Sequence, residues 1–329
     1  MTYLRNSILA TIIYYDILDF PLTLLEIYKY MINPGRLTRF KDSFGEITPG
    51  LIVEELDKLV SSKIIGHKNG FYFLDGRENL YNLRMEKDKL ANQKWKKFLR
   101  YCYWLQLAPF LRGIFASGSM AISNTDEKSD FDVLIIAKAG RLYSCRLFLW
   151  LVSSLMGVRR KKYERVAPDK LCFNHFITDR SLTIVHESLY NAQTYINLKP
   201  VFVSSELIGE FYGANLWLNN YAYNFKIQKN FVRRGIKPNK VILGFMGMIE
   251  RIMDSCFRNI LEGFMKRNQQ RRIFANPLTY ESGGRVISNE GELEFHPHSA
   301  EKKILERYKD KLTRFGIVPP FDEKDSGLK

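Results

Sequence analysis

Two aspartates, Asp130 and Asp132, stand one residue apart in an apolar segment and follow a Gly-Ser pair, Gly118 and Ser119. Residues two apart in a β-strand point the same way, so both carboxylates would face one site. Adjacent carboxylates repel each other unless a cation lies between them, and Mg²⁺ takes such oxygen ligands together with phosphate oxygens. Glycine lets the backbone approach a phosphate, and a helix N-terminus attracts the anion. The pattern therefore predicts a site for a divalent cation and a phosphate.

The elements that position these residues follow from the surrounding pattern. A short strand over residues 112–117 leads into the Gly-Ser turn, and the strand over residues 129–136 carries both aspartates. Residues 171–177 are a third strand. Helices are expected before and after the aspartates, over residues 78–109 (as one helix or two) and 141–156. Phe131 and Val133 alternate with the aspartates and would face a packed layer.

The order Gly-Ser, ten intervening residues, then Asp-apolar-Asp-apolar resembles the signature of the polymerase-β-like nucleotidyltransferase superfamily. The chain looks most like uncharacterised prokaryotic members that carry an N-terminal winged-helix domain. The resemblance implies that Asp130 and Asp132 bind Mg²⁺ (or Mn²⁺) and that Gly118, Ser119 and Ser129 help to hold an NTP. It also implies transfer of an NMP to a hydroxyl of an acceptor, which could be a small molecule, a protein or an RNA.

One position departs from that superfamily. Active members usually carry a third carboxylate on a later strand, and the matching catalytic position here is Asn174. Asparagine can offer a carbonyl oxygen to a cation but cannot act as a base. Asp179 and Glu187 are the nearby acids that could substitute for it. If Asn174 points into the site, strand alternation predicts that His175 faces the opposite side.

The N-terminal pattern predicts three helices followed by a hairpin, as in a winged-helix domain. Thr48 and Pro49 are typical of a helix start, and Asn69-Gly70 between apolar residues is typical of a hairpin turn. The third helix, which would read a DNA groove, carries acidic residues that repel phosphates. Only a weak nucleic-acid contact is therefore expected. The acidic residues are Glu54, Glu55 and Asp57.

The fold class predicted is α+β, with a small mixed sheet and helices in the nucleotidyltransferase core. We expect a winged-helix domain over residues 1–77, the core over 78–200 and a C-terminal helical region over 201–329. A long amphipathic helix over residues 239–264 could pack on the core or on a second subunit, which leaves a homo-oligomer open. His296-Pro297-His298 is a weak metal signal and is better interpreted as a loop.

Composition sets the outer bounds. The formal charge of +15 favours polyanionic partners such as nucleotides, nucleic acid or an acidic membrane surface. Arg141 and Arg146 are candidates for phosphate contact, whereas the basic run 159–162 is interpreted as a solvated face. The four cysteines have no metal-ligand spacing, no signal peptide is evident and no apolar run is long enough to span a bilayer. A cytoplasmic location is expected.

Three functional hypotheses remain. The first is a Mg²⁺-dependent nucleotidyltransferase. The second is a degenerate member that binds NTP and metal without transfer and acts as a regulator, because Asn174 replaces the expected acid. The third is a winged-helix nucleic-acid-binding protein with incidental aspartates. A P-loop NTPase and a hydrolase with a nucleophile elbow are unlikely classes, because neither Gly-x-x-x-x-Gly-Lys-Ser/Thr nor Gly-x-Ser-x-Gly occurs.

Overall fold

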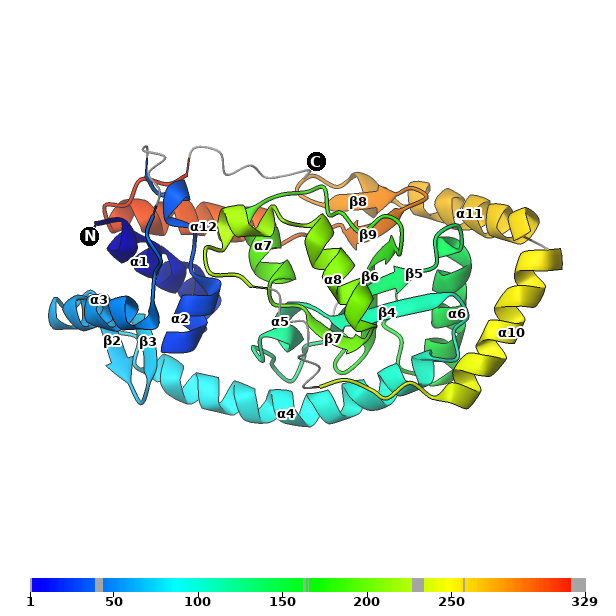
Figure 1. Ribbon diagram of the computed structural model, residues 1–329, viewed down its shortest axis with the longest axis horizontal. Helices are drawn as coiled ribbons and strands as arrows, with labels where there is room; N and C mark the ends of the chain where they lie inside the picture. The colour runs from blue at the N-terminus through cyan, green and yellow to red at the C-terminus, as the bar shows by residue number, and fades with distance from the viewer. Residues whose placement is uncertain are drawn as a thin grey trace.

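The computed structural model describes residues 2–38, 44–161, 164, 166–226, 234–256 and 258–320. Within these residues the chain is a mixed α+β protein with a three-stranded and a six-stranded sheet (Figure 1). This confirms the predicted α+β class. Lys162 of the basic run and the polar tail after residue 320 lie outside the described residues. No helix in the described part of the chain has both the length and the apolar character needed to cross a membrane.

The N-terminal elements occur in the predicted order of three helices and a hairpin. They are α1 (Thr2–Ile17), β1 (Leu22–Thr23), α2 (Leu24–Tyr30), the 3₁₀ helix η1 (Pro34–Arg36), α3 (Pro49–Ser61), β2 (Ile65–Lys68) and β3 (Phe71–Leu74). The strands form a sheet in the order β1-β3-β2. Thr48 caps α3 by accepting a hydrogen bond from the Leu51 amide, and Gly70 adopts the positive φ that a tight turn requires.

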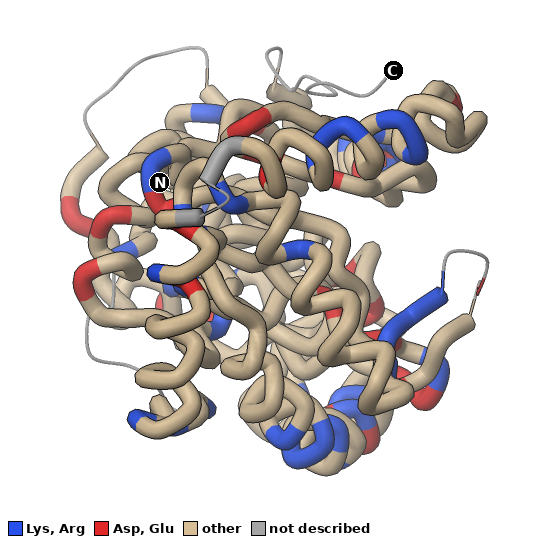
Figure 2. The backbone as a smooth tube through the Cα atoms, turned by 90° about the vertical axis from the view of Figure 1, so that its right-hand side faces the viewer, with Lys and Arg blue, Asp and Glu red and all other residues tan. Residues whose placement is uncertain are grey.

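Helix α4 (Asn79–Leu105) is a single long helix that runs beneath both the N-terminal elements and the core (Figure 1). Figure 2 shows basic residues gathered along it. Some of them make buried internal contacts. Arg84 donates to Glu26 at 2.8 Å and lies over the Phe20 ring, while Lys94 donates to the Ser129 carbonyl at 2.8 Å and pairs with Asp169. These two cations therefore fix the helix to its neighbours and do not form a solvated face.

The six-stranded sheet has the order β7-β4-β5-β6-β9-β8. Its strands are β4 (Leu111–Ala116), β5 (Phe131–Ala137), β6 (Leu171–Thr178), β7 (Lys199–Phe202), β8 (Arg285–Ser288) and β9 (Glu292–His296). Strands β5 and β6 are parallel and the other neighbouring pairs are antiparallel, so the sheet is mixed as expected. The expectation of a wholly helical C-terminal region is wrong, because the hairpin β8–β9 from that region completes the edge of the sheet.

The two faces of this sheet pack against different helices. One face contributes Phe131, Val133 and Ile135 to a core shared with α4 and with α6 (Leu142–Leu155), which confirms the packed layer expected for Phe131 and Val133. The other face contributes Leu134 and Ile136 to a second, larger core. That core includes α7 (Leu189–Tyr195), α8 (Ser205–Ala214), residues of α12 (Glu301–Arg314) and the N-terminal helices. One hydrophobic core therefore continues across the domain boundary expected at residue 77.

The remaining elements are short or lie at the periphery. They are α5 (Gly118–Ala121), α9 (Leu218–Tyr221), α10 (Lys240–Cys256), α11 (Arg258–Phe274) and the 3₁₀ helix η2 (Pro277–Tyr280). Helices α10 and α11 lie at the end of the molecule opposite the N-terminal elements (Figure 1). Together they replace the single helix expected over residues 239–264, and residue 257 between them lies outside the described residues. Glu250 of α10 binds Arg112 at 2.7 Å, which attaches this helix to β4.

Candidate functional site

The structure brings the two predicted aspartates together at the beginning of β5. Asp130 immediately precedes the strand and Asp132 is its second residue. Ligand atoms of Asp130, Asp132 and Cys172 of the parallel strand β6 all lie within 4.8 Å of one another. Burial raises the pKa of the Cys172 thiol, and the two carboxylates raise it further, which disfavours the thiolate form that binds metals. The oxygen atoms of the aspartates are therefore the donors suited to a hard cation.

Gly118 lies directly against Asp132. Its φ is +61°, in the region that favours glycine, and a Cβ at this position would collide with the Asp132 carboxylate. The Ser117 amide donates to the Asp132 carbonyl at 3.0 Å and fixes the turn to the strand. Helix α5 contains only four residues, so the expected helix N-terminus reduces to a single turn. Attraction for an anion would therefore come from individual amide groups and not from a long helix dipole.

Neither of the two predicted serines, Ser119 and Ser129, lines the cavity described below. Ser117 and Gly118 line it instead. The Ser129 hydroxyl donates to the Asp126 carboxylate at 2.8 Å and accepts from the Asp126 amide. Ser129 thus shapes the turn that leads to Asp130.

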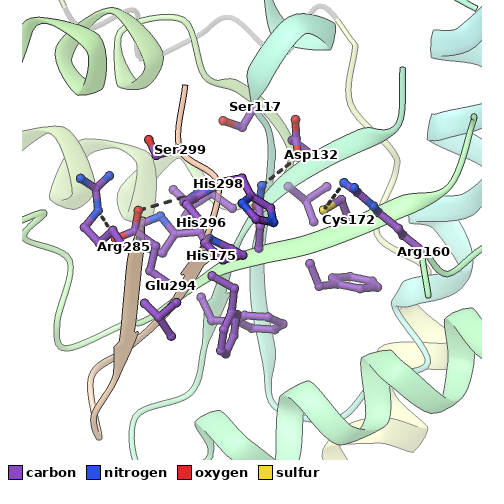
Figure 3. A pocket seen from close by; sticks show the side chains of 18 of the residues that line it. Ser117, Asp132, Arg160, Cys172, His175, Arg285, Glu294, His296, His298 and Ser299 are labelled. Carbon is purple, nitrogen blue, oxygen red and sulfur yellow. Dashed lines mark hydrogen bonds and ion pairs between the residues drawn. The ribbon is translucent and has the colours of Figure 1, made fainter. Parts of the chain in front are cut away.

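Arg160 is a site residue that the sequence interpretation assigned to a solvated face. Its Nη1 lies 2.5 Å from Asp130 Oδ2. The same nitrogen lies 3.6 Å from the Cys172 sulfur (Figure 3). The Arg160 amide donates to the Leu171 carbonyl at 3.0 Å, so the segment before β6 is held beside the start of that strand. A guanidinium therefore neutralises one of the two carboxylates.

Asn174 reaches the carboxylate pair, as predicted. Its Nδ2 donates to Asp132 Oδ1 at 2.8 Å. Along β5 and β6, Asp132 pairs with Cys172 but Leu134 pairs with His175, so β6 contains an extra residue between them. This β-bulge returns His175 to the face that carries Asp132 and Leu134. The prediction that His175 faces the opposite side is wrong, because strict alternation does not hold across a bulge.

Asp132 is electrostatically unusual. Burial, followed by the negative charge of Asp130, raises the pKa of Asp132 from 3.8 to about 7. Arg160 and the hydrogen bond from Asn174 act in the opposite direction without cancelling these effects. Two carboxylates in one partly dehydrated site hold a proton until another cation compensates them.

The carboxylate pair opens into a cavity of about 1200 Å³. Several basic side chains line it: Arg146, Arg159, Arg160, Lys161, Arg272 and Arg285. Burial lowers the pKa of Arg146 to about 10, which still leaves it charged at neutral pH. Arg141, the other predicted phosphate ligand, pairs with Asp254 at 2.6 Å and is not a lining residue. The cavity is large enough for a nucleotide and carries the charge that a triphosphate requires.

Neither proposed substitute for the missing acid lines this cavity. Asp179 follows the far end of β6, five residues beyond Asn174, or about 16 Å along an extended strand. Its carboxylate accepts a hydrogen bond from the Ala139 amide at 2.8 Å. Glu187 is exposed and precedes α7. In the described residues, Glu164 and Glu294 are the other carboxylates that line the cavity.

The hairpin β8–β9 adds a second polar cluster, and it shows that His296, interpreted from the sequence as part of a loop, is the last residue of β9. His175, Glu292 and Glu294 are buried and have ligand atoms within 4.8 Å of one another. Arg285 donates to Glu294 at 2.9 Å, and His296 lies 3.7 Å from its other oxygen (Figure 3). Burial alone would raise the pKa of Glu294, but His175 and Arg285 lower it to about 2. The alternation Glu292, Glu294, His296 was the available sequence signal, and its spacing of two is that of a strand.

No family model, curated protein or solved structure matches the chain. The functional argument therefore depends on the geometry of the carboxylate pair and its cavity.

Proposed function

We propose that the protein is a Mg²⁺-dependent nucleotidyltransferase that transfers an NMP from an NTP to a hydroxyl of an unidentified acceptor. The observation that carries the proposal is the contact of Gly118 with Asp132 beside Asp130, at the mouth of a cavity lined with basic residues. A surface pair of aspartates would need neither the left-handed glycine nor a half-buried carboxylate with a raised pKa. Mn²⁺ suits the same oxygen donors.

The residues present fit a hard divalent cation. Asp130 and Asp132 would hold it, and when bound it would neutralise charge on the phosphoryl groups of the nucleotide. Asn174 orients Asp132 through the hydrogen bond at 2.8 Å. Arg160 would release Asp130 to the cation and turn its guanidinium toward a phosphate, because both groups line the same cavity.

The turn at Ser117 and Gly118 supports the phosphate end of the nucleotide. Gly118 leaves room for a close approach, and the lining position of Ser117 favours it over Ser119 as the hydroxyl contact. Catalysis of this kind depends mainly on positioning and on charge stabilisation, so few side chains are required.

The test is titration of the purified chain with each NTP, with and without Mg²⁺, followed by intact mass and pyrophosphate measurements. Asp130→Asn should abolish Mg²⁺-dependent binding and any pyrophosphate release while the chain remains folded. Asp179→Asn is the matched control, because Asp179 follows the far end of β6 and lies outside the cavity lining. Normal turnover by Asp130→Asn would sink the proposal.

A second candidate is a regulator that binds NTP and metal without transfer. Asn174 favours it, because an amide beside Asp132 cannot accept the proton of an acceptor hydroxyl. Mg²⁺-dependent binding with no pyrophosphate release across a panel of hydroxyl acceptors would support this candidate. Pyrophosphate release with any of them would remove it.

The N-terminal elements are proposed to be a winged helix with a structural role. The exposed Glu54 and Asp57 make α3 a poor reader of DNA, whereas Glu55 is buried and paired with Lys58 at 3.2 Å. Duplex DNA binding that weakens steeply with salt and is lost on removing basic residues of this region would instead favour a nucleic-acid role.

A further inference from the structure

A buried cluster of imidazole and carboxylate groups lies on the sheet face that carries Leu134, separate from the Asp130 and Asp132 pair. His175 of β6 is directly opposite Glu294 of β9. Glu292 and His296 lie two residues to either side of Glu294, so the three β9 side chains share one face. The β-bulge in β6 brings His175 to that same face.

Glu294 carries an unsatisfied oxygen at the centre of this cluster. The residue is only 2% exposed and lines the cavity. Its Oε2 accepts from Arg285 at 2.9 Å, but Oε1 has no hydrogen-bond partner among the described residues. The nearest cluster nitrogen, His296 Nε2, lies 3.7 Å away, beyond hydrogen-bond distance. A buried carboxylate oxygen without a donor is costly, so this atom is suited to an added cation.

The surroundings of His175 resemble those of a metal-ligating histidine. Its Nδ1 lies 3.1 Å from the Tyr195 hydroxyl, and its Nε2 lies 2.9 Å from Glu292 Oε1. A ligating imidazole commonly uses one nitrogen for the metal and the other for a hydrogen bond that fixes the ring. Here Tyr195 can hold Nδ1 and leave Nε2 directed at the carboxylates.

The charges of the cluster do not balance. Arg285 pairs with both Glu294 and Glu301 at 2.9 Å. Glu292 adds a third carboxylate, so two negative charges remain when both imidazoles are neutral and one remains when His175 is protonated. One divalent cation would compensate them and would also use the free oxygen of Glu294.

We propose that His175, Glu292 and Glu294 form a second metal site, which takes a transition-series cation of the Zn²⁺ class, and that the partly exposed His296 side chain turns inward to add the fourth ligand. Zn²⁺ bonds of about 2.0–2.1 Å at tetrahedral angles separate neighbouring ligand atoms by roughly 3.3 Å. The ligand atoms of His175, Glu292 and Glu294 lie within 4.8 Å of one another, with His175 and Glu292 2.9 Å apart, whereas His296 contacts only Glu294, at 3.7 Å, and lies outside this group. Imidazole donors distinguish this site from the oxygen-only pair that suits Mg²⁺. The cation would bind the hairpin edge of the cavity to β6.

The test uses the full-length chain with Asp130→Asn and Asp132→Asn, so that the carboxylate pair no longer binds metal. Equilibrium dialysis against Zn²⁺ with elemental analysis should give about one ion per chain, and Co²⁺ should give the visible spectrum of a tetrahedral ion. Adding His296→Gln or Glu294→Gln should weaken Zn²⁺ binding by at least tenfold. His298→Gln is the control, because His298 is exposed and contacts Glu281.

Glu294→Gln removes a buried ion pair and could unfold the chain. The Zn²⁺ affinity of His296→Gln is therefore the result that decides for or against the metal site. The His296 side chain is partly exposed, and circular dichroism verifies that the variant is folded. An absence of Zn²⁺ binding, or equal affinity in His296→Gln and His298→Gln, would overturn the proposal and leave a structural ion network. Because the background already lacks both aspartates, the outcome does not depend on the nucleotidyltransferase proposal.

Discussion

Substitution of Gly118 by alanine tests whether the turn before α5 sets the geometry of the carboxylate pair. Gly118 has a φ of +61°, and an added Cβ would lie 2.4 Å from Asp132 Oδ2. Such a contact must open to at least 3.0 Å, so the carboxylate oxygen must move by about 0.6 Å. Functional groups have to be held within about 0.5 Å of their productive geometry, so this displacement should impair the site.

The expected result has two parts. The left-handed backbone costs alanine about 1–2 kcal/mol of stability. Displacement of Asp132 should additionally weaken Mg²⁺-dependent NTP binding or turnover by about 10- to 100-fold, since misplacement by about 1 Å can cost 100-fold. Denaturant unfolding measures the first effect, and titration with Mn²⁺ or with Mg²⁺ and NTP measures the second.

Gly140→Ala is the matched control for this substitution. Gly140 has a φ of +72°, and nothing lies within 4 Å of an added Cβ. It therefore isolates the backbone cost from the collision with Asp132. If both variants lose the same stability and both retain wild-type affinity for the metal and nucleotide, the reasoning about Gly118 is refuted.

Two further predictions concern the charges of the carboxylate pair. Arg160→Gln removes the cation from a partly exposed ion pair worth about 1 kcal/mol, so the affinity for Mg²⁺ without nucleotide should rise about fivefold. The affinity for Mg²⁺ together with NTP should fall, and calorimetry that shows both affinities falling would contradict the exchange of Arg160 for metal. The second prediction concerns pH. In the folded state Asp132 keeps its proton up to a pKa of about 7, whereas in the unfolded chain the same carboxyl group releases it near 3.8. Stability of the metal-free protein should therefore decrease as pH rises from about 4 to about 7, and Mg²⁺ affinity should increase over the same range. In Asp132→Asn, the free energy of unfolding measured across this range should lack this pH dependence. If the pH dependence persists in the variant, the proton belongs to another group.

The features that the sequence predicted correctly are local ones. The cap at Thr48, the turn at Gly70 and the shared direction of Asp130 and Asp132 each depend on a few neighbouring residues. Backbone sterics and side-chain periodicity act over that range, so the pattern carries the information. Asn174 was singled out by the resemblance to the superfamily, and it lies 2.8 Å from Asp132.

The features that escaped prediction depend on contacts between distant segments. Glu294 reaches His175 only because the C-terminal hairpin pairs with β6, and no local pattern specifies which strand becomes a neighbour. Arg160 looked like surface charge in a basic run, yet backbone pairing with Leu171 brings it to Asp130. Charge alone could not distinguish a solvated arginine from one that neutralises a half-buried carboxylate.

The bulge in β6 determines which side chains the cavity receives. In a regular strand, Cys172 and Asn174 would share the face of Asp132, and His175 would enter the opposite core among apolar residues. The extra residue aligns His175 with Leu134 on the face of Asp132, while Asn174 still contacts Asp132 at 2.8 Å. An imidazole that would be costly in the opposite core instead meets Glu292 and Tyr195. One inserted residue thus places a candidate Mg²⁺ site and a candidate Zn²⁺ site on adjacent strands of a single cavity wall, where the two can be tested independently.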